Sequence, residues 1–108
     1  TENGGTTVNT AASATFSTQY KTLIAKDASN ATVFEINLDG TTPATYTVGA
    51  TNAITYAGVS PFFIADAGNV IITTNASDKV SGTFQGTGTA AGGITSVTGT
   101  FTNITVVP

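Results

Sequence analysis

Apolar and polar residues alternate along most of this chain, and turn-forming residues interrupt the alternation about every eight to twelve positions. Alternation of this kind places successive side chains on opposite faces of an extended strand. The clearest case covers residues 32–38, where Phe34, Ile36 and Leu38 occupy every second position. No stretch carries apolar residues at the spacing of an amphipathic helix. The pattern therefore predicts an all-β chain.

Strands are predicted at residues 14–20, 22–26, 32–38, 44–48, 53–57, 61–64, 70–74, 80–84, 97–101 and 102–107. The first two ranges fit either two short strands or one bent strand. Turn signals lie at residues 27–30, 39–40, 66–69 and 75–79. Pro43 cannot lie inside a central strand, because it has no N–H group for the ladder. Phe62 and Phe63 are adjacent, so one ring must point away from the other.

A five-residue sequence occurs twice near the end of the chain, as Val-Ser-Gly-Thr-Phe at residues 80–84 and Val-Thr-Gly-Thr-Phe at residues 97–101. The segment between the copies is rich in glycine, which predicts a long β-hairpin. Gly82 and Gly99 each lie between Val and Phe on one face, where a missing side chain leaves room for a large neighbour. If the copies pair antiparallel, we expect Phe84 and Phe101 to fill these gaps.

These signals predict a single antiparallel β-sandwich or flattened barrel of about eight strands. Residues 12–108 would form this domain. Residues 1–11 are polar and would form an N-terminal extension without a core of its own.

Composition narrows the predicted cellular location and the predicted partners of such a domain. Charged residues make up 8% of the 108 residues, and 24 residues are threonine. An uncharged, hydroxyl-rich exterior is typical of proteins outside the cell or packed against copies of themselves. Three lysines, no arginine and a net charge of −3 argue against nucleic-acid binding and against docking on an anionic membrane. The longest apolar run, residues 61–65, is too short to span a bilayer.

The residue types needed for common catalytic chemistry are missing. Without Cys or His there is no disulfide, no thiolate nucleophile, no Ser-His-Asp triad and no zinc site. Of the six carboxylates, four lie in turn signals, where Asp usually accepts hydrogen bonds from its own backbone, and Glu35 is expected to face solvent. The six are Glu2, Asp27, Glu35, Asp39, Asp66 and Asp78. Asp27 with Asn30, or Asp66 with Asn69, lacks the spacing of a calcium loop. We therefore predict no catalytic, cofactor-binding or metal-binding residue, and no enzyme.

Three tyrosines, Tyr20, Tyr46 and Tyr56, are candidates for a sugar-binding platform, although a structural role in the core or at its rim is favoured. Three Asn-x-Ser/Thr sequences, beginning at Asn30, Asn75 and Asn103, match the N-glycosylation pattern, which arises easily by chance in such a composition.

Several stretches taken in order resemble a calycin-like β-sandwich domain of surface lipoproteins of the Bacteroidota. They are Ala-Thr-Tyr-Thr-Val-Gly at 44–49, Asn-Ala-Ile-Thr-Tyr at 52–56, Gly-Asn-Val-Ile-Ile-Thr at 68–73, Lys-Val-Ser-Gly-Thr-Phe at 79–84 and Val-Thr-Gly-Thr-Phe-Thr-Asn-Ile at 97–104. The resemblance covers about residues 12–107 and implies an antiparallel sandwich that is secreted or held at the cell surface. It implies no catalytic residue. The chain lacks the early Trp and the lipid-bearing Cys expected from the family.

Two functions are weighed on these grounds. The first is a non-enzymatic extracellular structural protein, a self-assembling surface or filament subunit joined by edge-strand addition. Residues 104–107 are apolar enough to act as the donor strand, and residues 6–12 are a poorer donor. The alternative is a cell-surface module that binds carbohydrate or a small apolar ligand, using Tyr20, Tyr46, Tyr56, Phe62 or Phe63. The predicted partners are thus copies of the same chain or a small ligand.

Overall fold

The computed structural model describes residues 2, 12–58 and 61–108, and within these residues the regular structure is entirely β. Its strands are β1 (Ser13–Ser17), β2 (Thr22–Lys26), β3 (Thr32–Asn37), β4 (Ala44–Thr47), β5 (Ala53–Tyr56), β6 (Phe63–Ile64), β7 (Ala67–Ala76), β8 (Lys79–Ala91) and β9 (Ile94–Val107). The predicted all-β fold is confirmed. Of the predicted extension at residues 1–11, only Glu2 is among the described residues.

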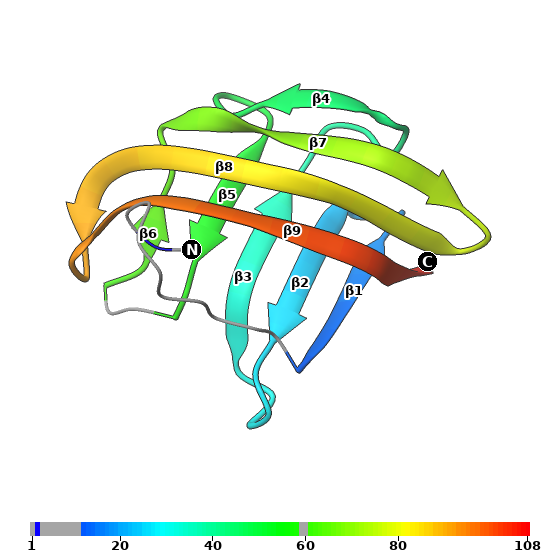
Figure 1. The fold of residues 1–108 in the computed structure, drawn as a ribbon, viewed down its shortest axis with the longest axis horizontal. Coiled ribbons are helices and arrows are strands. Elements are labelled where there is room, and N and C mark those ends of the chain that lie inside the picture. Colours follow the sequence, from blue (N-terminus) through cyan, green and yellow to red (C-terminus); the bar gives the residue numbers. More distant parts are fainter. Residues whose placement is uncertain (1, 3–11, 59–60) are drawn as a thin grey trace.

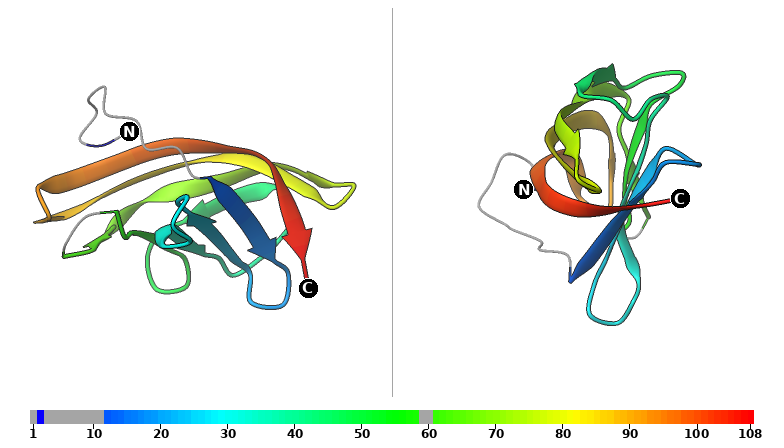
Figure 2. Two further views of the ribbon diagram at one scale, coloured as in Figure 1. Left: turned by 90° about the horizontal axis from the view of Figure 1, so that it is seen from below. Right: turned by 90° about the vertical axis from the view of Figure 1, so that its right-hand side faces the viewer.

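The strands form one curled sheet in the order β4-β7-β8-β9-β1-β2-β3-β5-β6, which makes a half-barrel. The long strands β7, β8 and β9 cross over β1, β2, β3 and β5, so that the sheet encloses its own core (Figures 1 and 2). The strand pairs are antiparallel with one exception, because β1 runs parallel to the end of β9 through Thr15↔Thr105 and Ser17↔Val107. The sheet is therefore mixed but mostly antiparallel, and the one parallel pair was not predicted from the sequence.

Most of the turns that end the strands lie where the sequence predicts them. Residues 18–21 separate β1 from β2, so the first two predicted ranges are two short strands. Asp27 Oδ1 accepts hydrogen bonds from the backbone N–H groups of Ser29 (2.9 Å) and Ala31 (3.0 Å), as expected for a turn. Phe63 is fully buried and Phe62 is 59% exposed, as their adjacency predicts.

The turn predicted at residues 66–69 is wrong, because β7 already begins at Ala67. Residues 67–69 pair with residues 85–87 of β8, and this long-range ladder overrides the local turn composition. Gly68 permits the close approach of the two strands, since a side chain there would collide with the Gln85 carbonyl. Asp66 Oδ2 accepts a hydrogen bond from the Thr89 N–H (3.2 Å) in place of a turn bond.

The β8–β9 hairpin carries both copies of the repeated sequence and confirms how they pair. Phe84 lies opposite Gly99, and Phe101 lies opposite Gly82. A methyl group on Gly99 would come within 2.7 Å of a ring carbon of Phe84, and one on Gly82 within 2.6 Å of the Phe101 ring. Each ring therefore lies over the glycine of the other copy, in a reciprocal aromatic–glycine exchange. Gly92 and Gly93, both at positive φ, close the hairpin.

The core is built from two rows of inward side chains that run across the second half of the sheet. The first row, Phe16, Leu23, Ile36 and Ile54, is in register from β1 to β5, and all its members are buried. The second row contains Ala14, Ala25, Phe34, Tyr56 and Phe63. Val70, Ile72, Val80, Phe84 and Val97 from β7, β8 and β9 complete the cluster.

A buried amide joins the two loops on either side of β4. Asn52 is 6% exposed, its Oδ1 accepts a hydrogen bond from the Asp39 N–H (2.9 Å), and its Nδ2 donates to the Thr47 carbonyl (3.0 Å). Thr51 Oγ1 donates to Asp39 Oδ2 at 2.8 Å. Asn52 thus satisfies two backbone groups that the loops leave without a ladder partner.

Replacement of Gly99 by alanine is expected to lower the free energy of unfolding by about 2 kcal/mol, because the new methyl group displaces the Phe84 ring. Denaturant titration of Gly99→Ala, with Thr100→Ala as the exposed control on the same strand, measures this cost. The double variant Gly99→Ala/Phe84→Leu should show favourable coupling, because leucine is smaller than the ring. If Gly99→Ala is as stable as the parent protein, the inferred packing of the Phe84 ring over Gly99 is wrong.

Asn52→Ala is expected to cost about 2 kcal/mol, because it leaves the Asp39 N–H and the Thr47 carbonyl without their partner. Thr51→Ala removes a single exposed hydrogen bond to the same loop and should cost less than about 1 kcal/mol. Hydrogen exchange at the Asp39 amide should accelerate in Asn52→Ala and stay slow in Thr51→Ala. Equal effects of the two substitutions would show that Asn52 does not join the loops.

Candidate functional site

A cavity of about 1030 Å³, about half open to solvent, lies in the curl of the sheet. Its apolar lining comes from both halves of the half-barrel and consists of Ala12, Ala14, Leu23, Ala25, Phe34, Ile36, Tyr56, Ile71, Phe84, Phe101 and Ile104. Sites for small molecules usually have volumes of about 300–1,000 Å³ and mostly apolar walls. The cavity is therefore at the upper end of the size range for a small-molecule site.

Small side chains in the second inward row make room for the cavity. In β1 and β2 this row carries Ala14 and Ala25, while the neighbouring positions of the first row carry Phe16 and Leu23. Ala14 and Ala25 both line the cavity. Alanine leaves a gap where a leucine or phenylalanine would reach the opposite wall.

Three aromatic rings meet at the cavity wall. Phe34 stacks on Tyr56 with their ring centroids 4.7 Å apart, and Phe34 and Phe84 meet edge to face with their ring centroids 5.1 Å apart. Tyr56 is 1% exposed, whereas Phe34 is only partly buried and so presents ring surface to the cavity. Stacked and edge-to-face pairs of this kind fix ring orientation beyond what burial alone does.

The repeated sequence shapes the part of the lining that comes from β8 and β9. Because Phe84 lies over Gly99 and Phe101 over Gly82, both rings cover their own strand pair. Gly99, Phe84 and Phe101 line the cavity together. A side chain at either glycine would push a ring away from its place against the sheet.

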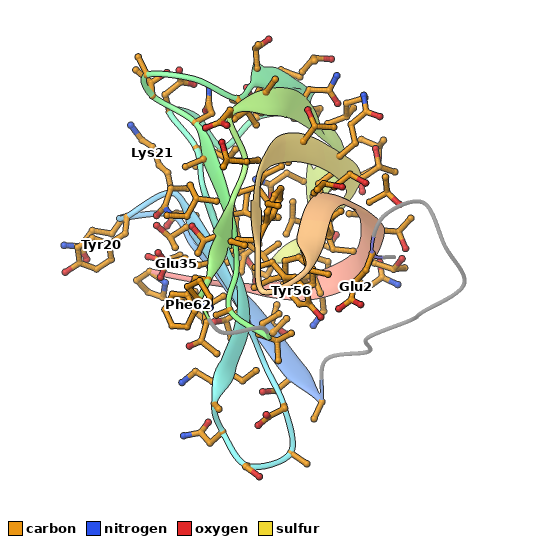
Figure 3. All side chains as sticks on the ribbon, turned by 90° about the vertical axis from the view of Figure 1, so that its left-hand side faces the viewer. Glu2, Tyr20, Lys21, Glu35, Tyr56 and Phe62 are labelled. Carbon is orange, nitrogen blue, oxygen red and sulfur yellow. The ribbon has the colours of Figure 1, made fainter. Side chains whose placement is uncertain are left out.

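Glu2 is the charged residue of the described lining. It forms an isolated antiparallel bridge with Val97 of β9, and its carboxylate accepts a hydrogen bond from the Tyr56 hydroxyl. Figure 3 shows Glu2 and Tyr56 on the same side of the sheet, turned toward each other. The rest of the polar lining is uncharged: Ser13, Asn69, Thr83, Gln85, Thr98, Thr100, Thr102, Asn103 and Thr105.

The three tyrosines do not form a platform. Tyr46 and Tyr56 are 7% and 1% exposed and belong to the core, while Tyr20 is 71% exposed in the β1–β2 turn. Figure 3 shows Tyr20 projecting away from Tyr56 and Glu2. The structure thus brings one of the three, Tyr56, to the cavity. Phe63 is in the core and Phe62 lies outside it.

The carboxylates are spread over the fold. In the part of the chain that the structure describes, no three acidic side chains come together to hold a metal ion. Asp27 and Asp66 bond to backbone N–H groups, as described above, and Glu35 accepts a hydrogen bond from Asn37 Nδ2 (3.2 Å). Across the described ranges, no helix is long and apolar enough to cross a membrane.

The predicted donor strand, residues 104–107, is already paired within its own chain. Ile104 and Thr105 pair with β8, and residues 105–107 pair with β1. The segment would have to leave two neighbours to complete another sheet. The predicted alternative donor, residues 6–12, lies outside the described residues except for Ala12.

An exposed apolar group instead lies at one end of the sheet. Phe62 and Ile64 are 59% and 58% exposed, and Ile64 belongs to β6, the last strand in the sheet order. An edge strand with exposed apolar side chains is a common site of pairing between chains.

No family model, curated protein or solved structure matches this chain. The arguments for its function therefore come from its own geometry.

Sequence reasoning missed the cavity and the role of Glu2. The signal available for the cavity was the pair Ala14 and Ala25, two small residues at inward positions of predicted strands. Nothing in the sequence links Glu2 to Tyr56, because their contact joins positions that are far apart in the chain.

Proposed function

We propose that this protein is a non-enzymatic binding module that takes a small, mainly apolar ligand into the cavity of its half-barrel. The observation that carries the proposal is the cavity of about 1030 Å³ with a wall of Phe34, Tyr56 and Phe84. Burial of apolar ligand surface supplies roughly 25 cal/mol per Å², so a site of this kind needs few polar contacts for affinity. The low charge and the abundance of threonine support a location outside the cell or at its surface.

Apolar ligands fit this cavity better than sugars do. Carbohydrate sites typically present exposed aromatic faces with many polar partners, whereas Tyr46 and Tyr56 are buried and Tyr20 lies apart from them. The predicted resemblance to a calycin-like domain is consistent with either class, and the preference for an apolar ligand rests on the cavity lining.

The uncharged fluorescent probe N-phenyl-1-naphthylamine is expected to bind with enhanced emission and a one-to-one stoichiometry. Ala14→Phe should weaken binding at least about tenfold, because the new ring occupies cavity space beside Ala25. Thr15→Phe is the matched control, with the same ring on the opposite face of β1, and should bind like the parent.

Circular dichroism and thermal melting establish that each variant is folded. If Ala14→Phe does not fold, Phe34→Ala provides the second measurement, because it removes the central ring of the aromatic wall and should also weaken binding. Absence of probe binding by the parent protein, or equal binding by the Ala14 and Thr15 variants, would contradict the proposal.

We also propose a second function, self-association into a surface or filament assembly. The observation in its favour is the exposed pair Phe62 and Ile64 on the edge of the sheet. Packing of this pair against its counterpart on another copy would bury apolar side chains of both, beside the contact that β6 makes with β8 in its own chain. This contact between copies would use β6 in place of residues 104–107, which are held between β8 and β1.

Light scattering over a concentration series is expected to show self-association of the parent protein and its loss in Phe62→Ser/Ile64→Thr. Tyr20→Ser is the control, because Tyr20 is the most exposed of the large hydrophobic side chains and does not belong to the β6 edge. A parent protein that stays monomeric at every concentration, with no fibres by electron microscopy, would exclude the second function and leave the first unaffected.

A further inference from the structure

We infer that the ligand of the cavity is an uncharged or cationic amphiphile whose hydrogen-bond-donating head meets Glu2, and that alkyl carboxylates are rejected. The inference rests on the proposed function and specifies its ligand class. It comes from the charges and hydrogen-bonding groups that surround the cavity.

Glu2 places a negative charge at the cavity. It is the charged member of the described lining, and its carboxylate is held by the Tyr56 hydroxyl and by the backbone bridge at Val97. A carboxylate offers about four lone-pair positions to hydrogen-bond donors. The Tyr56 hydroxyl takes one of them, so acceptor capacity remains for the hydroxyl or ammonium group of a ligand.

None of the lysines lines the cavity to receive an anion. Lys26 borders a separate, shallow hollow near Thr15 and Ile24, and Lys21 lies in the β1–β2 turn. Lys79 donates a hydrogen bond to Thr105 Oγ1 (3.1 Å), eight residues along β9 from the Glu2 bridge at Val97. A ligand carboxylate beside Glu2 would therefore face like charge in a mostly apolar setting, which is unfavourable.

The remaining polar lining accommodates a neutral head without selecting a charge. The other polar residues of the described lining are uncharged, and their backbone and side-chain groups include both hydrogen-bond donors and acceptors. An alcohol can bond to these groups and to Glu2, and an alkylammonium gains the charge-assisted bond to Glu2 in addition. The expected order of affinity is alkylammonium, then alcohol, then carboxylate.

Displacement of N-phenyl-1-naphthylamine by decylamine, decanol and decanoate, each below its micelle concentration at neutral pH, tests this order. The parent protein should bind decylamine about tenfold or more tightly than decanoate. Glu2→Gln should bring the two affinities to within about threefold, because the amide removes the charge and keeps the side-chain size. The affinity for decanol should differ least between the parent protein and Glu2→Gln.

Glu35→Gln is the matched control for overall charge. Glu35 is not part of the cavity lining and lies on the outer side of the sheet in Figure 3. This variant removes one negative charge and should retain the preference of the parent. If Glu35→Gln brings the affinities for decylamine and decanoate together as Glu2→Gln does, the preference arises from net charge and the inference is wrong.

The outcomes separate the inference from the proposed function. Displacement of the probe by all three compounds with equal affinity, or an order unchanged in Glu2→Gln, overturns the inference while the cavity remains a ligand site. Preference for decanoate also overturns it and points to the end of β9 near Lys79. Failure of the probe to bind the parent protein overturns the proposed function and this inference with it.

Discussion

Each phenylalanine of the repeated sequence lies over the glycine of the other copy, and this exchange sets the register of the longest hairpin in the sheet. A shift of the pairing by one residue would move both rings to the opposite face. The same hairpin connects the two halves of the sheet, because β8 also pairs with β7 and the end of β9 pairs with β1. Because Phe84 and Phe101 are held against the sheet, the wall they form is compatible with an open cavity. The same packing thus determines both the half-barrel and the space inside it.

Local features of the fold could be predicted from the sequence because they depend on neighbouring residues. Alternation located the strands, the Asp27 turn formed as expected, and the Gly–Phe pairing followed from the spacing of the two copies. The parallel pairing of β1 with β9 could not be predicted, since it joins the two ends of the domain and depends on how far the sheet curls. The start of β7 was wrong for a related reason, because a ladder with β8 outweighed the turn composition around Gly68.

The candidate site was less predictable than the fold. Its volume is a property of the curl, and only the small residues Ala14 and Ala25 gave a local signal of it. Phe34 and Tyr56 were recognised as strand residues, but their stacking requires the register of β3 with β5. Glu2 belongs to a segment predicted to lack a core, and a polar segment of this kind carries no sign of the tyrosine that will bind it. The presence of the Glu2 carboxylate at the cavity therefore depends on the folded structure and could not be predicted from the sequence.

Ligand binding and self-association would use different parts of the sheet. The cavity wall comes mainly from the central strands, β8, β9, β1, β2 and β3. The exposed Ile64 of β6, with Phe62 just before this strand, lies at one end of the strand order. A copy that packs against β6 would leave the lining from β9 and β1 in place. Residues 104–107, which the sequence offered as a donor strand, pair with β8 and β1 and keep the curl closed beside Ile104 and Thr105. Donation of that segment to another chain would open the cavity, so a strand-exchanging assembly built on it would lose the ligand site, whereas one built on β6 would retain it.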